Sequence, residues 1–239
     1  LYFINVFKQR IFGFYMGDKK KRRKKSKRPS FILGFDETNN GFNLDSEDYK
    51  PHKDSNLIVT GYLTNSKGAQ YGSRKYESKR KIFNNNRDIE RALTRGRYYI
   101  GQHPNFFYTV VSRRMIKHTP LPLLRANAIA LLTFKFFSSY DINPQQTQIV
   151  LDQMDGKDHT DFVKQGLGIW LEDTKIKTQY RVGYKADQKV PAVRTADRIG
   201  YYLAAIKFLG NLRKWPYRSR KISLSHLEDL AAEMRESFS

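Results

Sequence analysis

The stretch Phe31-Ile-Leu-Gly-Phe-Asp-Glu-Thr-Asn-Asn-Gly-Phe42 joins a short apolar run to two adjacent carboxylates, Asp36 and Glu37, and then to a polar turn. The apolar run Phe31–Phe35 predicts a buried strand. Placing two acids at the end of a buried strand costs desolvation free energy, and chains tolerate that cost most often where the acids hold a metal ion or move a proton. The stretch therefore predicts a strand that leads into the first part of an acidic site.

The composition favours a polyanionic partner. The chain has 239 residues, of which 39% are hydrophobic, so it can form one well-cored domain with tails or two small domains. Its net charge of +21 attracts nucleic acid first and an anionic membrane surface second. The sequence contains no cysteine, which excludes disulfides, thiolate zinc sites and cysteine nucleophiles. We expect an intracellular protein that has no stable membrane association, located in the cytoplasm or nucleoid.

The first part of the sequence is strongly basic. Lys19–Arg28 is a nearly continuous run of like charge and predicts a solvated arm, which either contacts phosphates, acts as a nuclear targeting signal or only keeps the chain soluble. Lys8, Gln9 and Arg10 interrupt the aromatic residues before it, so we do not expect a signal peptide. We divide the chain into a basic arm (1–29), an α/β domain (30–212), and a basic linker with a short amphipathic C-terminal helix (213–239).

The hydrophobic pattern after the arm predicts a mixed sheet flanked by helices. An initial run of strands followed by alternating helices and strands is typical of an α/β domain. We expect Thr119 to cap the most apolar helix and Ser225 to open a capping box at the last one. The expected further strands are 57–63, 69–76, 105–112, 147–154 and 178–184, and the expected helices are 88–97, 119–137, 159–173, 191–209 and 225 onward.

Further acids occur where elements end or bury a face. Asp152 closes the strand Ile149-Val-Leu-Asp, Asp187 follows the strand 178–184, and Asp197 lies on the apolar face of the helix 191–209. Mg²⁺ prefers oxygen ligands, and two such ions about 4 Å apart can activate a water and stabilise a leaving oxygen. We predict that Asp36, Asp152 and Asp197 hold metal, and that Glu37 and Asp187 complete the catalytic set.

Each of these acids also has a structural interpretation. Asp36 and Glu37 could open a polar loop, Asp152 could simply end a strand, and Asp187 could precede a helix as a cap. Asp197 could pair with one of the arginines beside it in the sequence.

Three motifs carry a resemblance to known nucleases. Gly34-Phe-Asp-Glu-Thr-Asn39 resembles the Gly-Ile-Asp-Glu opening of type 2 ribonucleases H, although Thr38-Asn39 stands where those enzymes have a small residue and glycine. Lys185-Ala-Asp-Gln-Lys-Val-Pro-Ala-Val193 resembles a stretch of the archaeal type 2 enzymes, and Arg194-Thr-Ala-Asp197 resembles a helix of RuvC-like nucleases. The resemblance implies a ribonuclease-H-like fold over residues 30–209. It matches Asp36 to the leading acid and leaves open whether Asp187 or Asp197 completes the site.

Cations interleaved with aromatic residues predict a nucleic-acid-binding surface, since cations hold phosphates and aromatic faces stack on unpaired bases. A solvated charged face is the alternative. The residues that we assign to this surface are Arg74, Lys75, Arg80, Lys81, Arg95, Arg97, Arg213, Lys214, Trp215 and Arg218.

Together these features predict a nuclease that uses two Mg²⁺ or Mn²⁺ ions to hydrolyse RNA, an RNA–DNA hybrid or structured nucleic acid. The alternative is a non-catalytic nucleic-acid-binding module with the same fold. The sequence does not select the substrate, a protein partner or the oligomeric state.

Overall fold

The computed structural model describes residues 29–39, 57–65, 86–116, 118–152, 157–209 and 217–238, and every structural statement below refers to these. Their strands form one five-stranded sheet in the order β3-β2-β1-β4-β5. β2 is antiparallel to β1 and β3, whereas β4 runs parallel to both β1 and β5. The strands are β1 (Phe31–Asn39), β2 (Leu57–Asn65), β3 (Phe106–Val111), β4 (Thr147–Asp152) and β5 (Gln179–Gly183). The expected strand at 69–76 lies outside the described residues.

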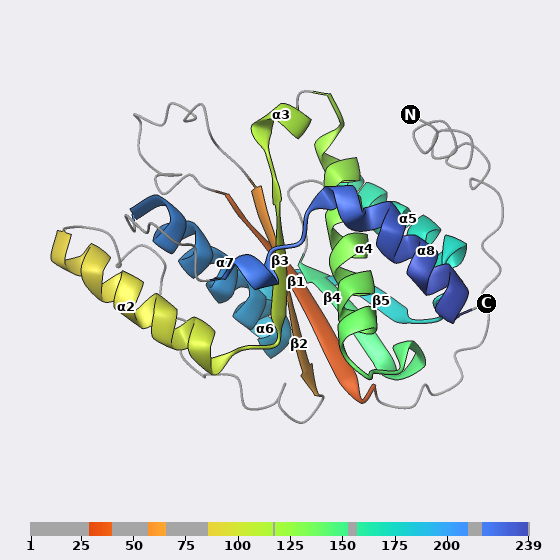
Figure 1. Cartoon of the computed structure of the whole chain (residues 1–239), viewed down its shortest axis with the longest axis horizontal. Helices are drawn as coiled ribbons and strands as arrows, with labels where there is room; N and C mark the ends of the chain where they lie inside the picture. The colour runs from red at the N-terminus through yellow and green to blue at the C-terminus, as the bar shows by residue number, and fades with distance from the viewer. Residues whose placement is uncertain are drawn as a thin grey trace.

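Helices cover both faces of the sheet. The helices are α2 (Asn86–Gln102), α3 (Arg113–Ile116), α4 (Leu121–Ser139), α5 (Lys157–Asp173), α6 (Ala186–Lys189), α7 (Pro191–Leu209) and α8 (Leu227–Ser237). Figure 1 shows α2, α6 and α7 on one side of the sheet and α4, α5 and α8 on the other. The expected α/β fold, a mixed sheet flanked by helices, is confirmed.

β1 is longer than the apolar run that predicted it. It continues through Asn39 because β2 pairs with its whole length, from Phe31 opposite Asn65 to Asn39 opposite Leu57. Asp36 and Glu37 therefore lie within a strand and not at its tip. Since successive side chains of a strand point to opposite faces, the two acids belong to different sides of the sheet.

α4 is the central core helix. It is apolar nearly all round and packs between the sheet and the helices α5 and α8. Among the described helices it alone has the length and apolar character that could span a membrane, and it is mostly buried within the fold. The expected cap at Thr119 is wrong: Pro120 is the N-cap residue, and no side chain bonds to the first turn.

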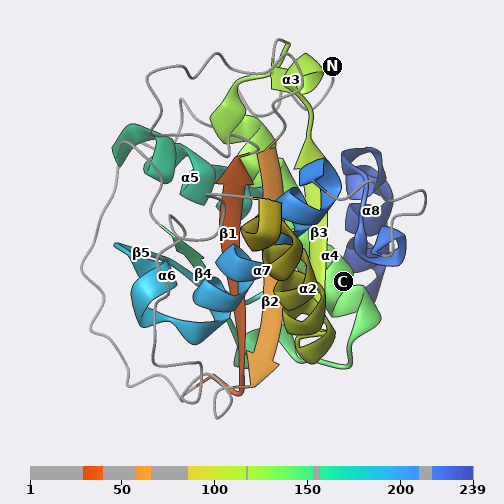
Figure 2. The ribbon, with the colours of Figure 1, turned by 90° about the vertical axis from the view of Figure 1, so that its left-hand side faces the viewer.

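α7 packs closely against β1 and β2 on the other face (Figure 2). Gly34 of β1 allows this approach, because a Cβ atom there would lie 2.4 Å from the backbone of Ala192 and Val193. Further along, a Cβ atom on Gly200 of α7 would lie 2.8 Å from the Oγ1 atom of Thr38. The two glycines thus fix how α7 lies along β1.

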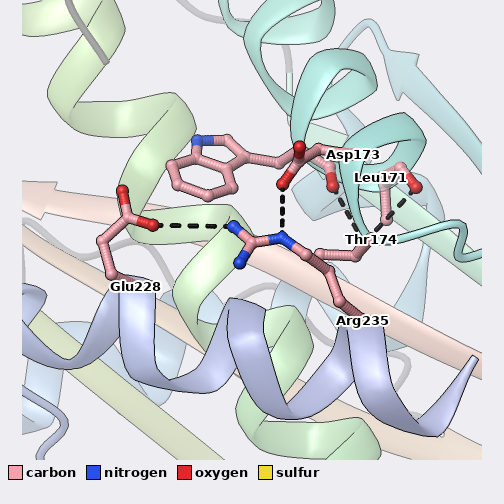
Figure 3. Close-up of polar contacts among 6 residues, drawn as sticks. Leu171, Asp173, Thr174, Glu228 and Arg235 are labelled. Atoms are coloured by element: carbon pink, nitrogen blue, oxygen red, sulfur yellow. Dashed lines mark hydrogen bonds and ion pairs between the residues drawn. The ribbon is translucent and has the colours of Figure 1, made fainter. Parts of the chain in front are cut away.

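α8 docks onto α4 through Leu227, Ala231 and Met234, all of which belong to the core. The Arg235 Nε atom also donates to the Oδ2 atom of Asp173 at 3.0 Å, which ties α8 to the end of α5 (Figure 3). This agrees with the expectation of a short C-terminal amphipathic helix.

The polar contacts around α8 correct one expectation. Ser225 lies in a 3₁₀ turn (Leu224–His226) before α8 and does not cap the helix, whose N-cap residue is His226.

Glu228 in the first turn of α8 approaches Arg235 of the same helix, with the Glu228 Oε2 and Arg235 Nη2 atoms 3.7 Å apart (Figure 3). Burial raises the pKa of Glu228, and the nearby Arg235 charge opposes that rise only in part.

Candidate functional site

Asp36 within β1 and Asp152 at the end of β4 lie side by side on two adjacent parallel strands. The register of β1 and β4 pairs Phe35 with Leu151, and each acid is the next residue along its own strand. Two positions earlier, Gly34 pairs with Val150, which packs against the start of α7. Because side chains repeat their direction every second residue, both acids point to the face that α7 covers.

Asp197 reaches the same place from α7. It lies four residues after Val193 and three residues before Gly200, so the three positions share one face of the helix. Val193 lies over Gly34 and Gly200 lies beside Thr38, which places Asp197 above the part of β1 that contains Asp36. Asp197 is only 2% exposed, and its charge contributes to raising the pKa of the neighbouring Tyr201 hydroxyl, after burial and Tyr202.

Two threonine hydroxyls line the same face. Thr60 of β2 is the direct cross-strand partner of Asp36, and Thr38 follows Asp36 by two residues on β1. Among the described residues, the buried Oγ1 atoms of Thr38 and Thr60 have no hydrogen-bond partner. A buried hydroxyl without a hydrogen-bond partner lowers the stability of the fold. The two threonines beside Asp36 therefore favour a bound water, ion or ligand oxygen at this place.

The carboxylates are held by backbone N–H groups. The Glu37 N–H donates to the Asp36 Oδ1 atom at 2.7 Å, and the Ala186 N–H donates to the Asp152 Oδ1 atom at 2.6 Å. Within the described part of the chain, no three acidic or histidine side chains are close enough together to hold a metal ion. The oxygen donors suit a hard cation such as Mg²⁺, but Asp36, Asp152 and Asp197 would have to turn toward one another to share it.

Glu37 lies on the opposite face and has a different environment. Its Oε2 atom is 2.7 Å from the Nε atom of Arg125 on α4, and both side chains are nearly buried. This pair connects the end of β1 to the core helix. Arg125 was not among the predicted site residues, although it is one of only two charged residues, with Lys135, in a largely apolar helix. Such a position signals a buried partner of opposite charge.

Asp187 lies in the first turn of α6 and is half-buried. Its backbone carbonyl accepts from the Arg194 Nε atom at 3.1 Å, and Arg194 also donates to the carbonyl of Gln188. Arg194 therefore joins α6 to α7. Ala186, the residue before Asp187, donates its backbone N–H to Asp152, so Asp187 lies beside the site. Asp187 is on α6, whereas Asp36 and Asp152 are on the strands β1 and β4.

Part of the predicted nucleic-acid surface can be located. Arg95 and Arg97 are exposed on α2, and Arg218 is exposed in the 3₁₀ turn Arg218–Arg220. Burial raises the pKa of Tyr217, and Arg97 opposes this rise, so these two cationic segments come close together. The other seven predicted residues lie outside the described part of the chain: Arg74, Lys75, Arg80, Lys81, Arg213, Lys214 and Trp215.

Comparison with known proteins gives structural likenesses. No family model matches the chain, and no curated protein matches it. Ribonuclease H2 from Pyrococcus horikoshii OT3 is 16% identical with a TM-score of 0.46, over 87% of this chain and 98% of that one. A chain of the PCNA:RNase HII complex from Archaeoglobus fulgidus is 15% identical with a TM-score of 0.43, over 86% of this chain and 90% of that one. The fold class that the described elements show is α/β: a mixed five-stranded sheet flanked by helices.

Proposed function

We propose that the chain is a metal-dependent nuclease that hydrolyses phosphodiester bonds in RNA, an RNA–DNA hybrid or structured nucleic acid. The observation that carries the proposal is the placement of Asp36 and Asp152 side by side on adjacent parallel strands, with Asp197 on the helix that covers them. Three acids from distant parts of the sequence thus gather in a chain whose net charge is +21. An acidic site within a cationic protein suits the cleavage of a polyanion, because cations hold the substrate while acids hold metal.

The residues have distinct roles in this proposal. Asp36, Asp152 and Asp197 would hold Mg²⁺ or Mn²⁺, which activates a water and stabilises the leaving oxygen when bound. Thr38 and Thr60 offer hydroxyl groups beside these acids. The Glu37–Arg125 pair holds the end of β1 from the opposite face. The exposed arginines of α2 and of the 3₁₀ turn near Tyr217 contact phosphates.

The test replaces each of the three acids by its amide. Asp36→Asn, Asp152→Asn and Asp197→Asn should each lower the cleavage rate by at least about 100-fold, the range found when one group that stabilises the transition state is removed. Labelled single strand, duplex, hybrid and junction substrates are incubated with Mg²⁺, Mn²⁺ or EDTA, and EDTA should abolish cleavage.

Asp141→Asn is the matched control, because Asp141 is an exposed acid that follows α4 outside the acidic site. It should cleave like the wild type. Melting temperatures identify any variant that has simply unfolded. Wild-type rates in Asp36→Asn with Mg²⁺ would exclude this site.

One observation favours a second candidate, a non-catalytic nucleic-acid-binding module. Backbone N–H groups already engage Asp36 and Asp152, as they would if these acids only closed a strand and a turn. A module of this kind binds RNA with a steep salt dependence but is not stabilised by divalent ions. A Mg²⁺-dependent rise in melting temperature that Asp36→Asn removes would instead favour the nuclease, since a ligand that binds only the folded state stabilises it.

A further inference from the structure

The turn after β5 presents an aromatic ring flanked by cations. Tyr184 directly follows β5 and is 61% exposed, which is unusual for a large aromatic side chain. The Nζ atom of Lys185 lies 5.2 Å from the centroid of its ring, and the Nζ atom of Lys189 lies 5.6 Å from it. The fold thus leaves the Tyr184 ring in solvent and places two positive charges around it.

This turn adjoins the acidic site. The register of β4 and β5 pairs Asp152 with Gly183, the residue before Tyr184. Two residues after Tyr184, the Ala186 N–H donates to the Asp152 Oδ1 atom at 2.6 Å. Tyr184 and Lys185 are therefore held between two residues that both contact Asp152. A nucleic acid with its phosphate at the acids would extend past this ring.

Lys185 has a left-handed backbone, with φ of 51° and ψ of 49°. This conformation costs free energy for any residue other than glycine, and residues in it are found most often at binding and catalytic sites. Glycine would adopt the same turn more easily. The presence of lysine here keeps an ammonium group beside Tyr184 at the expense of backbone strain.

We propose that Tyr184, Lys185 and Lys189 form a stacking platform for an unpaired base of a single-stranded nucleic-acid segment. The base stacks on the ring, and the lysines bind the phosphates on either side of it. Lysine has a flexible stem, so each ammonium group can move from the ring to a phosphate when a base arrives. The two lysines would be enough to bind phosphate groups. The exposed Tyr184 ring adds a flat apolar surface, which suits the stacking of a base.

The inference rests on the proposed function for the location of the nucleic acid, but stacking requires neither metal nor cleavage. The experiment therefore uses the full chain in EDTA and a single-stranded oligonucleotide that contains 2-aminopurine, whose fluorescence falls when the base stacks. Wild type and Tyr184→Phe should quench the fluorescence. Tyr184→Ala should lose the quenching and bind about tenfold more weakly, within the range for one base stacked on an aromatic ring.

A pair of lysine variants tests the phosphate contacts. Lys185→Gln and Lys189→Gln should each reduce the salt slope of binding to a single strand by about 0.7. Lys175→Gln is the matched control: Lys175 is also exposed with a positive φ of 57°, but it precedes β5 and so lies at the other end of that strand. Lys175→Gln should leave the slope unchanged.

The outcomes separate this inference from the proposed nuclease. Unchanged quenching and affinity in Tyr184→Ala, with a wild-type melting temperature, would overturn the platform even if the protein cleaves nucleic acid. Equal effects of Lys175→Gln and Lys185→Gln on the salt slope would also overturn it. Loss of quenching in Tyr184→Ala supports the platform even if no substrate is cleaved with Mg²⁺.

Discussion

At the scale of single residues, two neighbouring acids on β1 have unlike surroundings. Asp36 shares its face with Asp152 and Asp197, whereas Glu37 pairs with Arg125 beneath the sheet. The sequence predicted one acidic motif because both residues follow the same apolar run. The alternation of side chains along a strand separates them. Position on the strand, more than adjacency in the sequence, thus decides which acid can take part in the chemistry.

The first prediction concerns the Glu37–Arg125 pair. The two side chains are 14% and 13% exposed, so removal of either leaves a nearly buried charge. Glu37→Gln and Arg125→Met should each lower the free energy of unfolding by about 2–4 kcal/mol, slightly less than for a fully buried pair. The double variant should lose less than the sum of the two, because no charge is then left alone. Urea denaturation measures all three.

The same variants separate two roles for Glu37. If Glu37 only positions β1, cleavage by Glu37→Gln and Arg125→Met should fall by similar factors. If Glu37 instead binds metal, Glu37→Gln should be far less active than Arg125→Met. Strictly additive losses of stability would contradict the buried pair.

The elements that contain the candidate metal ligands could be predicted better than the contacts around them. The apolar patterns located the strands and the helix on which Asp36, Asp152 and Asp197 lie, whereas a metal site shared by these acids stays a prediction. Arg125 was overlooked because a charge within a largely apolar helix does not identify its partner on another element. The length of β1 was underestimated because pairing with β2, a contact between distant residues, extends it past the apolar run.

At the scale of elements, the docking of α7 on β1 determines where Asp197 lies. The bounds of α7 were predicted correctly, because Pro191 opens it and its apolar periodicity is regular. The caps at Thr119 and Ser225 were predicted wrongly. Pro120 takes the N-cap position of α4, and a 3₁₀ turn precedes α8. The residue at which each helix begins depends on the backbone conformation of the preceding segment more than on the presence of a capping side chain.

The second prediction tests this docking at Gly34. A Cβ atom there would lie 2.4 Å from the backbone of Ala192 and Val193, which cannot yield as a flexible side chain would. Gly34→Ala should therefore lower the free energy of unfolding by about 1–3 kcal/mol, as overpacking does. It should also reduce cleavage, since α7 and Asp197 must move away from β1.

Gly101→Ala is the control for this substitution. Gly101 lies in α2, and nothing lies within 4 Å of a Cβ atom added there. Alanine in a helix is favoured over glycine, so Gly101→Ala should stabilise the protein by about 0.5–1 kcal/mol. Thermal or urea unfolding of both variants gives the comparison. Gly34→Ala as stable as the wild type would show that α7 does not depend on this close approach.

At the scale of the whole molecule, the excess of positive charge is the dominant feature. Three of the acids lie on the α7 side of the sheet, on β1, β4 and α7, and lysines and arginines outnumber acids by 44 to 23 in the whole chain. Nine lysines and arginines lie within residues 19–28 alone. We therefore expect the arm to contribute affinity for any nucleic acid, whereas under the proposed function the acidic site cleaves it and the turn at Tyr184 binds an unpaired base.

The last prediction separates these contributions by deleting residues 1–28. Each phosphate contact adds about 0.7 to the salt slope for single strands, so an arm that reaches about five phosphates contributes about 3.5. The deletion should lower the measured slope by about that amount and weaken binding at low salt. The melting temperature should not change, because all the strands and helices that the structure describes lie after the arm. At saturating substrate the cleavage rate should stay within about threefold, because uniform binding affects KM more than kcat. A slope that the deletion leaves unchanged would mean that the cations of the folded domain, and not the arm, hold the nucleic acid.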